Sequence, residues 1–241
     1  MQKKIEILGC FIDAVDSRDA LQKAEEFILQ GIPSHVITLN AEIAYAASSD
    51  PELKKIINKA DLVTPDGIGI VWAARRKGYD LKERVTGIDM VYNLSELASE
   101  KGYKVFLLGA APGVAEKAAE NLQLKYPDLI ICGTRDGYFR EEEVDEVIDE
   151  IRNLSPHILM VALGAPKQEF FINRYKERLE VPLCLGVGGS FDVISGLKKR
   201  APEIMIKLNL EWLYRLVLEP KRLKRQMALP KFVIKVLKEE K

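Results

Sequence analysis

The sequence predicts an α/β fold with a Rossmann-like parallel sheet flanked by helices, followed by a C-terminal helical amphipathic appendage. Short apolar runs alternate with longer amphipathic stretches along residues 1–196, as expected for strands alternating with helices. Several runs are apolar on both faces, which is typical of strands that helices cover on both sides. We therefore expect two parts, a Rossmann-like domain at 1–196 and a basic helical appendage at 197–241.

Six apolar runs predict the strands of this sheet. They cover residues 36–39, 62–64, 105–108, 129–132, 158–163 and 183–187, and a further N-terminal strand is expected at 5–11. Helical patterns lie between them. Asp50 and Pro51 are an N-cap and a first-turn proline that open a helix to about Ala60, and 111–126 and 141–153 predict two more helices.

The composition excludes several classes of protein. With 47% hydrophobic and 30% charged residues, the chain is neither disordered nor rich enough in long apolar runs to span a bilayer. Three cysteines without a Cys-x-x-Cys pair predict no disulfide framework, and two histidines are too few for a His-rich zinc site. Glu6 interrupts the N-terminal segment too early for a signal peptide. We expect a cytoplasmic protein.

The net charge of zero hides an asymmetry between the two parts. Residues 197–241 hold 13 Lys and Arg and 5 Asp and Glu, a net charge of +8, and residues 1–196 therefore carry −8. A basic segment of this kind suits an anionic partner such as nucleic acid, phospholipid headgroups or a phosphorylated ligand. An ordinary solvated basic helix is the alternative.

Glycines follow two of the predicted strands where a ligand is expected. Ligands bind beyond the carboxyl ends of parallel strands, and Gly109 and the segment Gly188-Gly189-Ser190 lie there, each before a helical stretch. Glycine lets backbone N–H groups approach a phosphate, but a tight strand-to-helix turn explains either loop equally well. Neither loop fits the nicotinamide fingerprint, and the sequence lacks a P-loop.

Two aspartates in these loops have two possible roles each. Asp66 lies between Pro65 and Gly67 at a strand end, where a carboxylate can act as a general base towards a hydroxyl group or cap the next helix. Asp192 follows the second glycine loop and can bind ribose hydroxyls or serve as an N-cap.

Cations are expected to replace a metal at this site. No Asp-x-Asp pair that would clamp a metal on a nucleotide diphosphate occurs near a strand end. If a diphosphate leaves during the reaction, its charge must then be met by Arg, Lys and backbone N–H groups. Arg84 is the best candidate in residues 1–196, and a surface salt bridge is its alternative role.

The C-terminal region predicts three amphipathic segments. In residues 203–219, charged residues recur every fourth position beside apolar faces. Further segments start at Pro220 and Pro230, and the last has three lysines opposite Phe232 and other apolar side chains. A basic face opposite an apolar one is typical of a helix in a membrane interface, although packing on the body or on another subunit fits the same spacing.

Several motifs in order along the chain resemble the WecG/TagA/CpsF family of bacterial glycosyltransferases, in particular its wall teichoic acid branch. They are Thr38-x-Asn40, Pro65-Asp66-Gly67-x-Gly69, Gly164-x-Pro166-x-Gln168-Glu169, Gly186-x-Gly188-x-x-Phe191-Asp192, Arg200-Ala201-Pro202 and Glu211-Trp212-x-x-Arg215. The resemblance covers nearly the whole chain and implies an inverting transfer that needs neither metal nor other cofactor.

The resemblance also implies the substrates. The donor would be UDP-N-acetylmannosamine (UDP-ManNAc), and the acceptor would be N-acetylglucosamine (GlcNAc) linked to undecaprenyl diphosphate, extended through a β-1,4 bond on the cytoplasmic face of the membrane. A donor such as UDP-N-acetylmannosaminuronic acid is one alternative, and a nucleotide-binding membrane scaffold without catalysis is another. Independently of the resemblance, an apolar helix at the C-terminus must be covered when it is off the membrane, so we expect a weak homo-oligomer. We expect no nucleic acid partner.

The resemblance assigns roles to individual residues. Asp66 would be the general base, and Arg84 would stabilise the leaving UDP diphosphate. Thr38, Asn40 and Gln168 would position the sugars, and Asp192 and Tyr138 would contact the nucleoside. The acceptor's lipid diphosphate would be bound by three arginines of the appendage, Arg215, Arg222 and Arg225.

Overall fold

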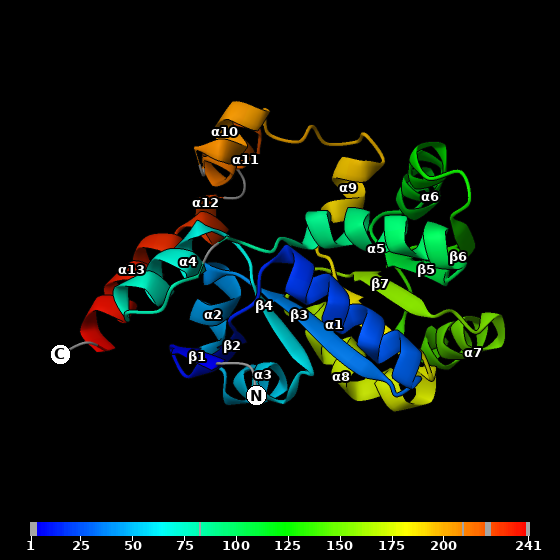
Figure 1. Ribbon diagram of the computed structural model, residues 1–241, viewed down its shortest axis with the longest axis horizontal. Coiled ribbons are helices and arrows are strands. Elements are labelled where there is room, and N and C mark those ends of the chain that lie inside the picture. Colours follow the sequence, from blue (N-terminus) through cyan, green and yellow to red (C-terminus); the bar gives the residue numbers. More distant parts are fainter. Residues whose placement is uncertain (1–3, 82, 209, 220–222, 240–241) are drawn as a thin grey trace.

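The structure, a computed structural model, describes residues 4–81, 83–208, 210–219 and 223–239, without the side chains of Lys207, Arg215, Lys224 and Arg225. Its centre is a six-stranded parallel sheet in the order β4-β3-β8-β7-β5-β6 (Figure 1). The strands are β3 (Ser34–Leu39), β4 (Leu62–Pro65), β5 (Lys104–Gly109), β6 (Ile130–Arg135), β7 (Ile158–Ala162) and β8 (Leu183–Gly186). The predicted α/β fold and all six strands of the sheet are confirmed.

The expected N-terminal strand is instead a hairpin. β1 (Lys4–Ile7) pairs antiparallel with β2 (Cys10–Asp13) in a separate two-stranded sheet. Leu8 and Gly9 have φ angles of 51° and 77°, and such left-handed backbone turns the chain back on itself. An apolar run alone does not reveal this turn.

Nine helices precede the C-terminal segment within the described residues, and two of them begin as the sequence predicts. Asp50 caps α3 by accepting from the Glu52 and Leu53 N–H groups at 3.0 Å, and a 3₁₀ turn over Glu141–Glu143 leads into α7. The helices are α1 (Ser17–Gln30), α2 (Ala41–Ala47), α3 (Pro51–Lys59), α4 (Ile68–Arg76), α5 (Gly87–Lys101), α6 (Val114–Lys125), α7 (Val144–Leu154), α8 (Lys167–Leu179) and α9 (Ser190–Ile194).

Helices cover both faces of the sheet, and successive residues of a strand point to opposite faces. Alternate residues of one strand therefore pack into different hydrophobic cores. In β5, Val105 and Leu107 pack under α1, α5 and α6, whereas Phe106 and Leu108 pack under α7 and α8. A third core joins the hairpin, α2, α3 and α4 to β3 and β4. This explains why the sequence of these strands is apolar on both faces.

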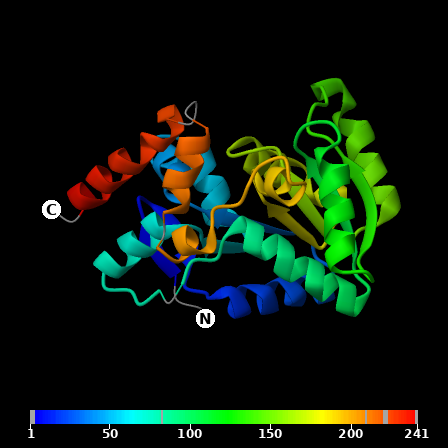
Figure 2. The same ribbon diagram turned by 90° about the horizontal axis from the view of Figure 1, so that it is seen from above.

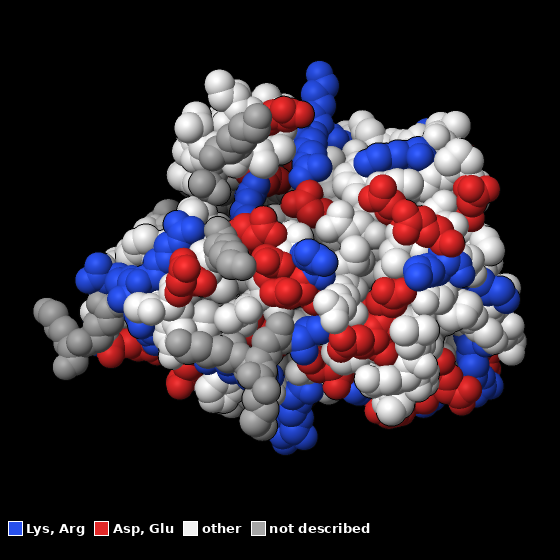
Figure 3. Space-filling view, viewed as in Figure 1, with Lys and Arg blue, Asp and Glu red and all other residues white. Residues whose placement is uncertain are grey.

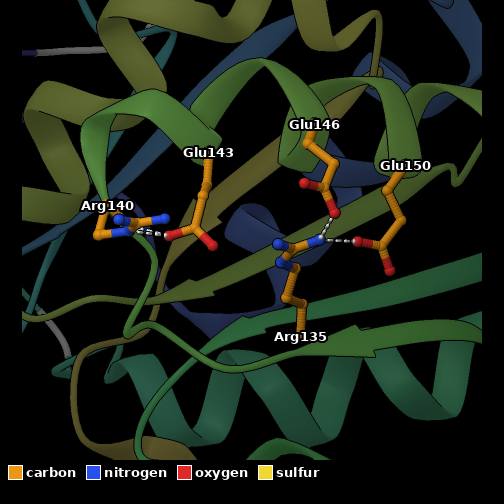
Figure 4. A network of polar contacts seen from close by, with 5 residues as sticks. All are labelled: Arg135, Arg140, Glu143, Glu146 and Glu150. Atoms are coloured by element: carbon orange, nitrogen blue, oxygen red, sulfur yellow. Dashed lines mark hydrogen bonds and ion pairs between the residues drawn. The ribbon is translucent and has the colours of Figure 1, made fainter.

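The edge strand β6 is tied to α7 by charged side chains. Arg135 contacts Glu150 at 2.6 Å and Glu146 at 3.5 Å, and Arg140 contacts Glu143 at 3.1 Å (Figure 4). The hydrogen bond to Glu150 raises the pKa of Arg135. This network lies at the outer edge of the sheet, where it stabilises packing.

The C-terminal segment from Ala201 onwards, which we call the tail, forms four described helices: α10 (Glu203–Lys207), α11 (Glu211–Leu218), α12 (Leu223–Gln226) and α13 (Ala228–Glu239). The single helix expected over 203–219 is therefore two helices, and the last helix starts two residues before Pro230. In Figures 1 and 2, α10 and α11 stand apart from the sheet, whereas α13 lies beside α2 and α4. Within the described residues, no helix combines the length and hydrophobicity that a membrane span requires.

The last helix is packed on the body. Phe232 and Val236 are completely buried in the core formed by the hairpin, α2 and α4, and Lys235 donates to the Ser48 hydroxyl at 2.8 Å. One apolar face of α13 thus covers protein, while Val233 and Leu237 on its flank are more than one third exposed. For Phe232 and Val236, of the three roles left open by the sequence, packing on the body is the one observed.

Neighbouring strands send their loops to opposite faces of the sheet. The loop after β8 leads to α9 on the face covered by α1, α5 and α6, whereas the loops after β3 and β7 lead to α2 and α8 on the other face. Loops that diverge in this way open a crevice at the carboxyl ends of the strands.

Candidate active site

A large cavity occupies this crevice. Its volume is about 2040 Å³, and its walls are the loops after β3, β4, β5, β7 and β8 on one side and α4, α11 and α13 on the other. Both tryptophans of the chain, Trp72 and Trp212, line it. All but one of the predicted site residues of the body also line it: Thr38, Asn40, Asp66, Arg84, Tyr138, Gln168, Gly188, Gly189, Ser190 and Asp192.

Backbone hydrogen bonds bring Asp66 and Arg84 together. The Asp66 N–H donates to the Leu39 carbonyl at 2.9 Å, which fixes the loop after β4 beside the end of β3. The Val85 N–H donates to the Pro65 carbonyl at 2.8 Å. Since Asp66 and Arg84 each neighbour one partner of that bond, both residues enter the cavity from adjacent backbone.

Asp66 is not the N-cap of the helix that follows it. The N-cap of α4 is Gly67, with a φ of 83° and no side-chain cap, a backbone conformation that favours glycine. Of the two roles left open by the sequence, the structure therefore leaves Asp66 as a carboxylate that lines the cavity.

Thr38 and Asn40 support the loop after β3 with part of their polar groups. The Asn40 side-chain oxygen accepts from the Ile43 N–H at 3.0 Å and caps α2, and the Thr38 hydroxyl donates to the Gly186 carbonyl at 3.4 Å. Gly87 packs against them, because an added Cβ would lie 3.4 Å from the Thr38 Oγ1. These contacts hold β3, β8 and the start of α5 close together at the cavity.

Gln168 is held at both ends of its amide. Its Nε2 donates to Glu169 Oε1 at 2.9 Å, and its Oε1 accepts from the Gly188 N–H at 3.0 Å. Glu169 is buried, and desolvation raises the pKa of its carboxyl group. An added Cβ on Gly186 would lie only 2.6 Å from the Gln168 Nε2, so the glycine is required for this packing. Gln168 thus connects the loops after β7 and β8.

The loop after β8 ends in an ion pair that the sequence did not predict. Ser190 donates to the Val187 carbonyl at 2.6 Å, and Asp192 lies in the first turn of α9 with its carboxylate 2.7 Å from Lys198 Nζ. Asp192 is therefore not the N-cap, which is Gly189. Lys198 also lies 3.5 Å from Glu219, just after α11.

Two predicted residues differ from the rest in their surroundings. Gly109 does not line the cavity, and an added Cβ would lie 2.5 Å from the Ala162 carbonyl carbon. Its glycine allows β5 and β7 to approach, which is the structural role that the sequence left open, and its expected role in ligand binding stays a prediction. Tyr138 is 76% exposed at the rim of the cavity.

The tail places the carboxylate of Glu211 beside Arg84, the residue of the body that was predicted to bind a diphosphate. Arg84 Nη1 lies 3.2 Å from Glu211 Oε2, with side-chain exposures of 18% and 10%. Arg84 is thus in neither an exposed salt bridge nor an unoccupied part of the cavity. The predicted arginines of the tail cannot be placed in the same way, because Arg222 and the side chains of Arg215 and Arg225 lie outside the described residues.

Sequence reasoning missed the cavity residues of the segment after α9. Lys198 and Lys199 line the cavity together with Lys167, which starts α8. The run of basic residues from Lys198 to Arg200 was the available signal. Among the residues that the structure describes, no three His, Cys, Asp or Glu side chains gather closely enough to hold a metal, and metal independence stays a prediction.

Comparison with known proteins agrees with the motifs. The model of the glycosyl transferase WecG/TagA/CpsF family matches residues 5–241. A Bacillus subtilis (strain 168) relative is 40% identical over 223 residues, which cover 92% of this chain and 86% of the relative. A relative from Bacillus spizizenii is 38% identical, with coverages of 89% and 83%.

A Staphylococcus aureus (strain NCTC 8325 / PS 47) relative is 34% identical over 237 residues, which cover 98% of this chain and 92% of the relative. All three relatives carry the name N-acetylglucosaminyldiphosphoundecaprenol N-acetyl-beta-D-mannosaminyltransferase. The family resemblance drawn from the motifs is confirmed.

Proposed function

Because the chain belongs to the WecG/TagA/CpsF family of glycosyl transferases, we propose that it transfers N-acetylmannosamine from UDP-ManNAc to GlcNAc-diphosphoundecaprenol. This is an early step in making the linkage unit of wall teichoic acid. The names of the relatives support the donor sugar and the acceptor. The observation that carries the proposal is that Asp66 and Arg84 line one large cavity from adjacent loops.

The proposed reaction uses these two side chains for opposite charges. Asp66 accepts the proton of the acceptor hydroxyl while the oxygen of that hydroxyl attacks the anomeric carbon of the donor sugar. The bond from that carbon to the diphosphate breaks, and UDP leaves with the bonding electron pair. Arg84 offsets the charge that develops on the diphosphate, and the anomeric configuration inverts because attack and departure occur on opposite faces.

The size of the cavity supports two substrates. A typical pocket for one small molecule has a volume of about 300–1,000 Å³, and the cavity of about 2040 Å³ exceeds that range. The polar loops after β7 and β8 and the lysines after α9 suit the nucleotide and its phosphates. The apolar side chains of α4, α11 and α13 line the other side.

The tail supports a peripheral position on the membrane. Ile204, Leu208 and Val217 of the α10–α11 region are between 61% and 70% exposed. The described side chains over these helices, at the upper left of Figure 3, are mostly uncharged. An exposed apolar surface on a basic segment suits an anionic bilayer. The cytoplasmic leaflet is the proposed location, since UDP-sugars are cytoplasmic, and self-association stays a prediction.

The proposed function is tested by UDP release in EDTA with UDP-ManNAc and a lipid-diphosphate-GlcNAc analogue. We expect release that depends on the acceptor and that EDTA does not abolish. Release only with another nucleotide sugar would keep the reaction class and change the donor. No release with any donor would overturn the proposal in favour of a nucleotide-binding scaffold.

A further inference from the structure

The ion pair between Arg84 and Glu211 joins the two parts of the chain inside the cavity. The residues are 127 positions apart, and their side chains meet at 3.2 Å. Both line the cavity, and Glu211 is buried. The Glu211 carboxylate of the tail therefore affects how the Arg84 guanidinium can bind a diphosphate.

Contacts at both ends of α11 attach this helix to the cavity wall. Glu211, the first residue of α11, contacts Arg84 at 3.2 Å, and the N–H groups of Leu213 and Tyr214 close the first turn of the helix onto the Leu210 carbonyl at 3.1 Å each. Beyond the other end of the helix, Glu219 lies 3.5 Å from Lys198, which itself contacts Asp192. The helix that carries Glu211 is therefore attached to the cavity wall at two points.

The geometry of the guanidinium decides what the pair does. Bonding through Nη1 orients the planar group and leaves the edge formed by Nε and Nη2 to meet a diphosphate with two parallel hydrogen bonds. An arginine fixed before the substrate binds does not have to be ordered during the reaction. The ion pair thus holds the arginine of the loop in one orientation only when α11 is docked.

We infer that Glu211 is a positioning residue that aligns Arg84 for the diphosphate of the nucleotide. The role of Arg84 in this inference rests on the proposed function. The opposite reading of the geometry is that Glu211 competes with the diphosphate for Arg84. A competing carboxylate and a positioning carboxylate predict opposite effects of its removal.

The first experiment compares Glu211→Ala and Glu211→Gln with a matched control. Lys77 and Glu239 form an ion pair at 3.1 Å that also joins the body to the tail, but neither residue lines the cavity. We expect Glu211→Ala to lower kcat by up to about 10²-fold, since misplacing a catalytic group by about 1 Å can cost that much. Glu211→Gln should lose less, and Glu239→Gln should match the wild type. Higher activity or tighter UDP binding in Glu211→Ala would overturn the inference in favour of competition.

The second experiment asks whether Glu211 acts through Arg84. A residue that works only by placing another adds nothing once that other residue is gone, so a double-mutant cycle separates the two roles. We expect Arg84→Ala and Glu211→Ala each to weaken UDP binding several-fold, and the double variant to bind UDP no more weakly than Arg84→Ala alone. Independent losses that multiply in the double variant would assign Glu211 a purely structural role and overturn the inference.

The tryptophans report separately on the docking of α11. Trp212 follows Glu211 directly, and Trp72 faces the same cavity, so their fluorescence should be nearly unchanged in Glu211→Gln if the helix stays docked. Reduced UDP affinity with unchanged fluorescence supports positioning, whereas undocking without any change in UDP affinity contradicts it. UDP binding is measurable whichever sugar the enzyme transfers, so failure of the proposed donor and failure of this inference give different results.

Discussion

The body and the tail bury their apolar side chains to very different extents. Every residue of β7 and β8 is buried, and helices cover both faces of the sheet. In the tail, the apolar side chains that are buried among the described residues are those of Ala201, Phe232 and Val236, while Ile204 and Val217 are largely exposed.

This difference shows that the body is held by its own core and that the tail is attached at a few points. Phe232 and Val236 attach α13 by burial, and ion pairs attach α11 at the cavity. Arg200 of the connecting segment adds another ion pair, to Asp89 at the start of α5. The chemistry proposed for the body therefore depends on a segment whose remaining apolar surface is available to a partner.

The largest expected effect belongs to the body. Replacing Asp66 with Asn should leave the fold unchanged and lower sugar transfer by about 10²–10⁴-fold, the usual contribution of a general base. UDP release measured in EDTA checks this, with the exposed Asp128→Asn as control. Turnover close to that of the wild type would exclude Asp66 as the base.

The attachment of α13 is tested by two neighbouring residues. Phe232 is completely buried and Val233 is 36% exposed. Phe232→Ala should cost about 3–5 kcal/mol in the free energy of unfolding, as large-to-small changes in a core do. Val233→Ala should cost much less. Equal effects in urea denaturation would mean that α13 is not attached through this face.

The two histidines of the chain differ in burial, since His35 is deeply buried and His157 is only partly buried. Burial, with a smaller contribution from Lys176, lowers the pKa of His35 to about 3, so the folded state binds this proton less readily than the unfolded state does. Its contribution to stability is therefore present above pH 6.5 and is lost as the pH falls from 6.5 towards 3. At pH 4.5 the loss should be about 3 kcal/mol.

Replacing His35 with Met should remove this loss, so that the unfolding free energy falls less steeply between pH 6.5 and 4.5. Burial lowers the pKa of His157 as well, but this side chain is only partly buried and its Nδ1 accepts from the Lys104 N–H at 2.9 Å, so the same change at His157 should alter the pH profile less. Parallel pH profiles for wild type and His35→Met would contradict the prediction.

The smallest expected effect belongs to the exposed surface of the tail. Replacing Ile204 or Val217 with Ser should weaken binding to anionic liposomes by roughly tenfold each, since an apolar side chain of this size contributes about 1.5–3 kcal/mol when buried. UDP affinity should not change. Leu124→Ser is the control, because Leu124 is 79% exposed on α6 of the body. If all variants bound the liposomes equally well, this surface would not be the one that contacts the membrane.

Local patterns in the sequence determined the sheet and several of the cavity residues. The apolar runs predicted all six strands, because strands covered on both faces, such as β7 and β8, carry apolar side chains at nearly every position. Asp66 could be found because residues at the carboxyl ends of parallel strands meet at one edge, whereas Gln168 was assigned through the family resemblance. The excess of positive charge at the C-terminus was likewise visible without a structure.

Tertiary structure alone decided which residues meet across long distances in the chain. The approach of β5 to β7 explains Gly109, the left-handed turn at Leu8 and Gly9 divides the first strand, and the docking of α11 brings Glu211 to Arg84. A helical repeat shows which side chains share a face, but not what that face packs against, because that depends on the free energy of the whole folded chain. For this reason the sequence predicted a cationic site and an amphipathic tail, and only the fold showed that the tail supplies the carboxylate that holds the cation.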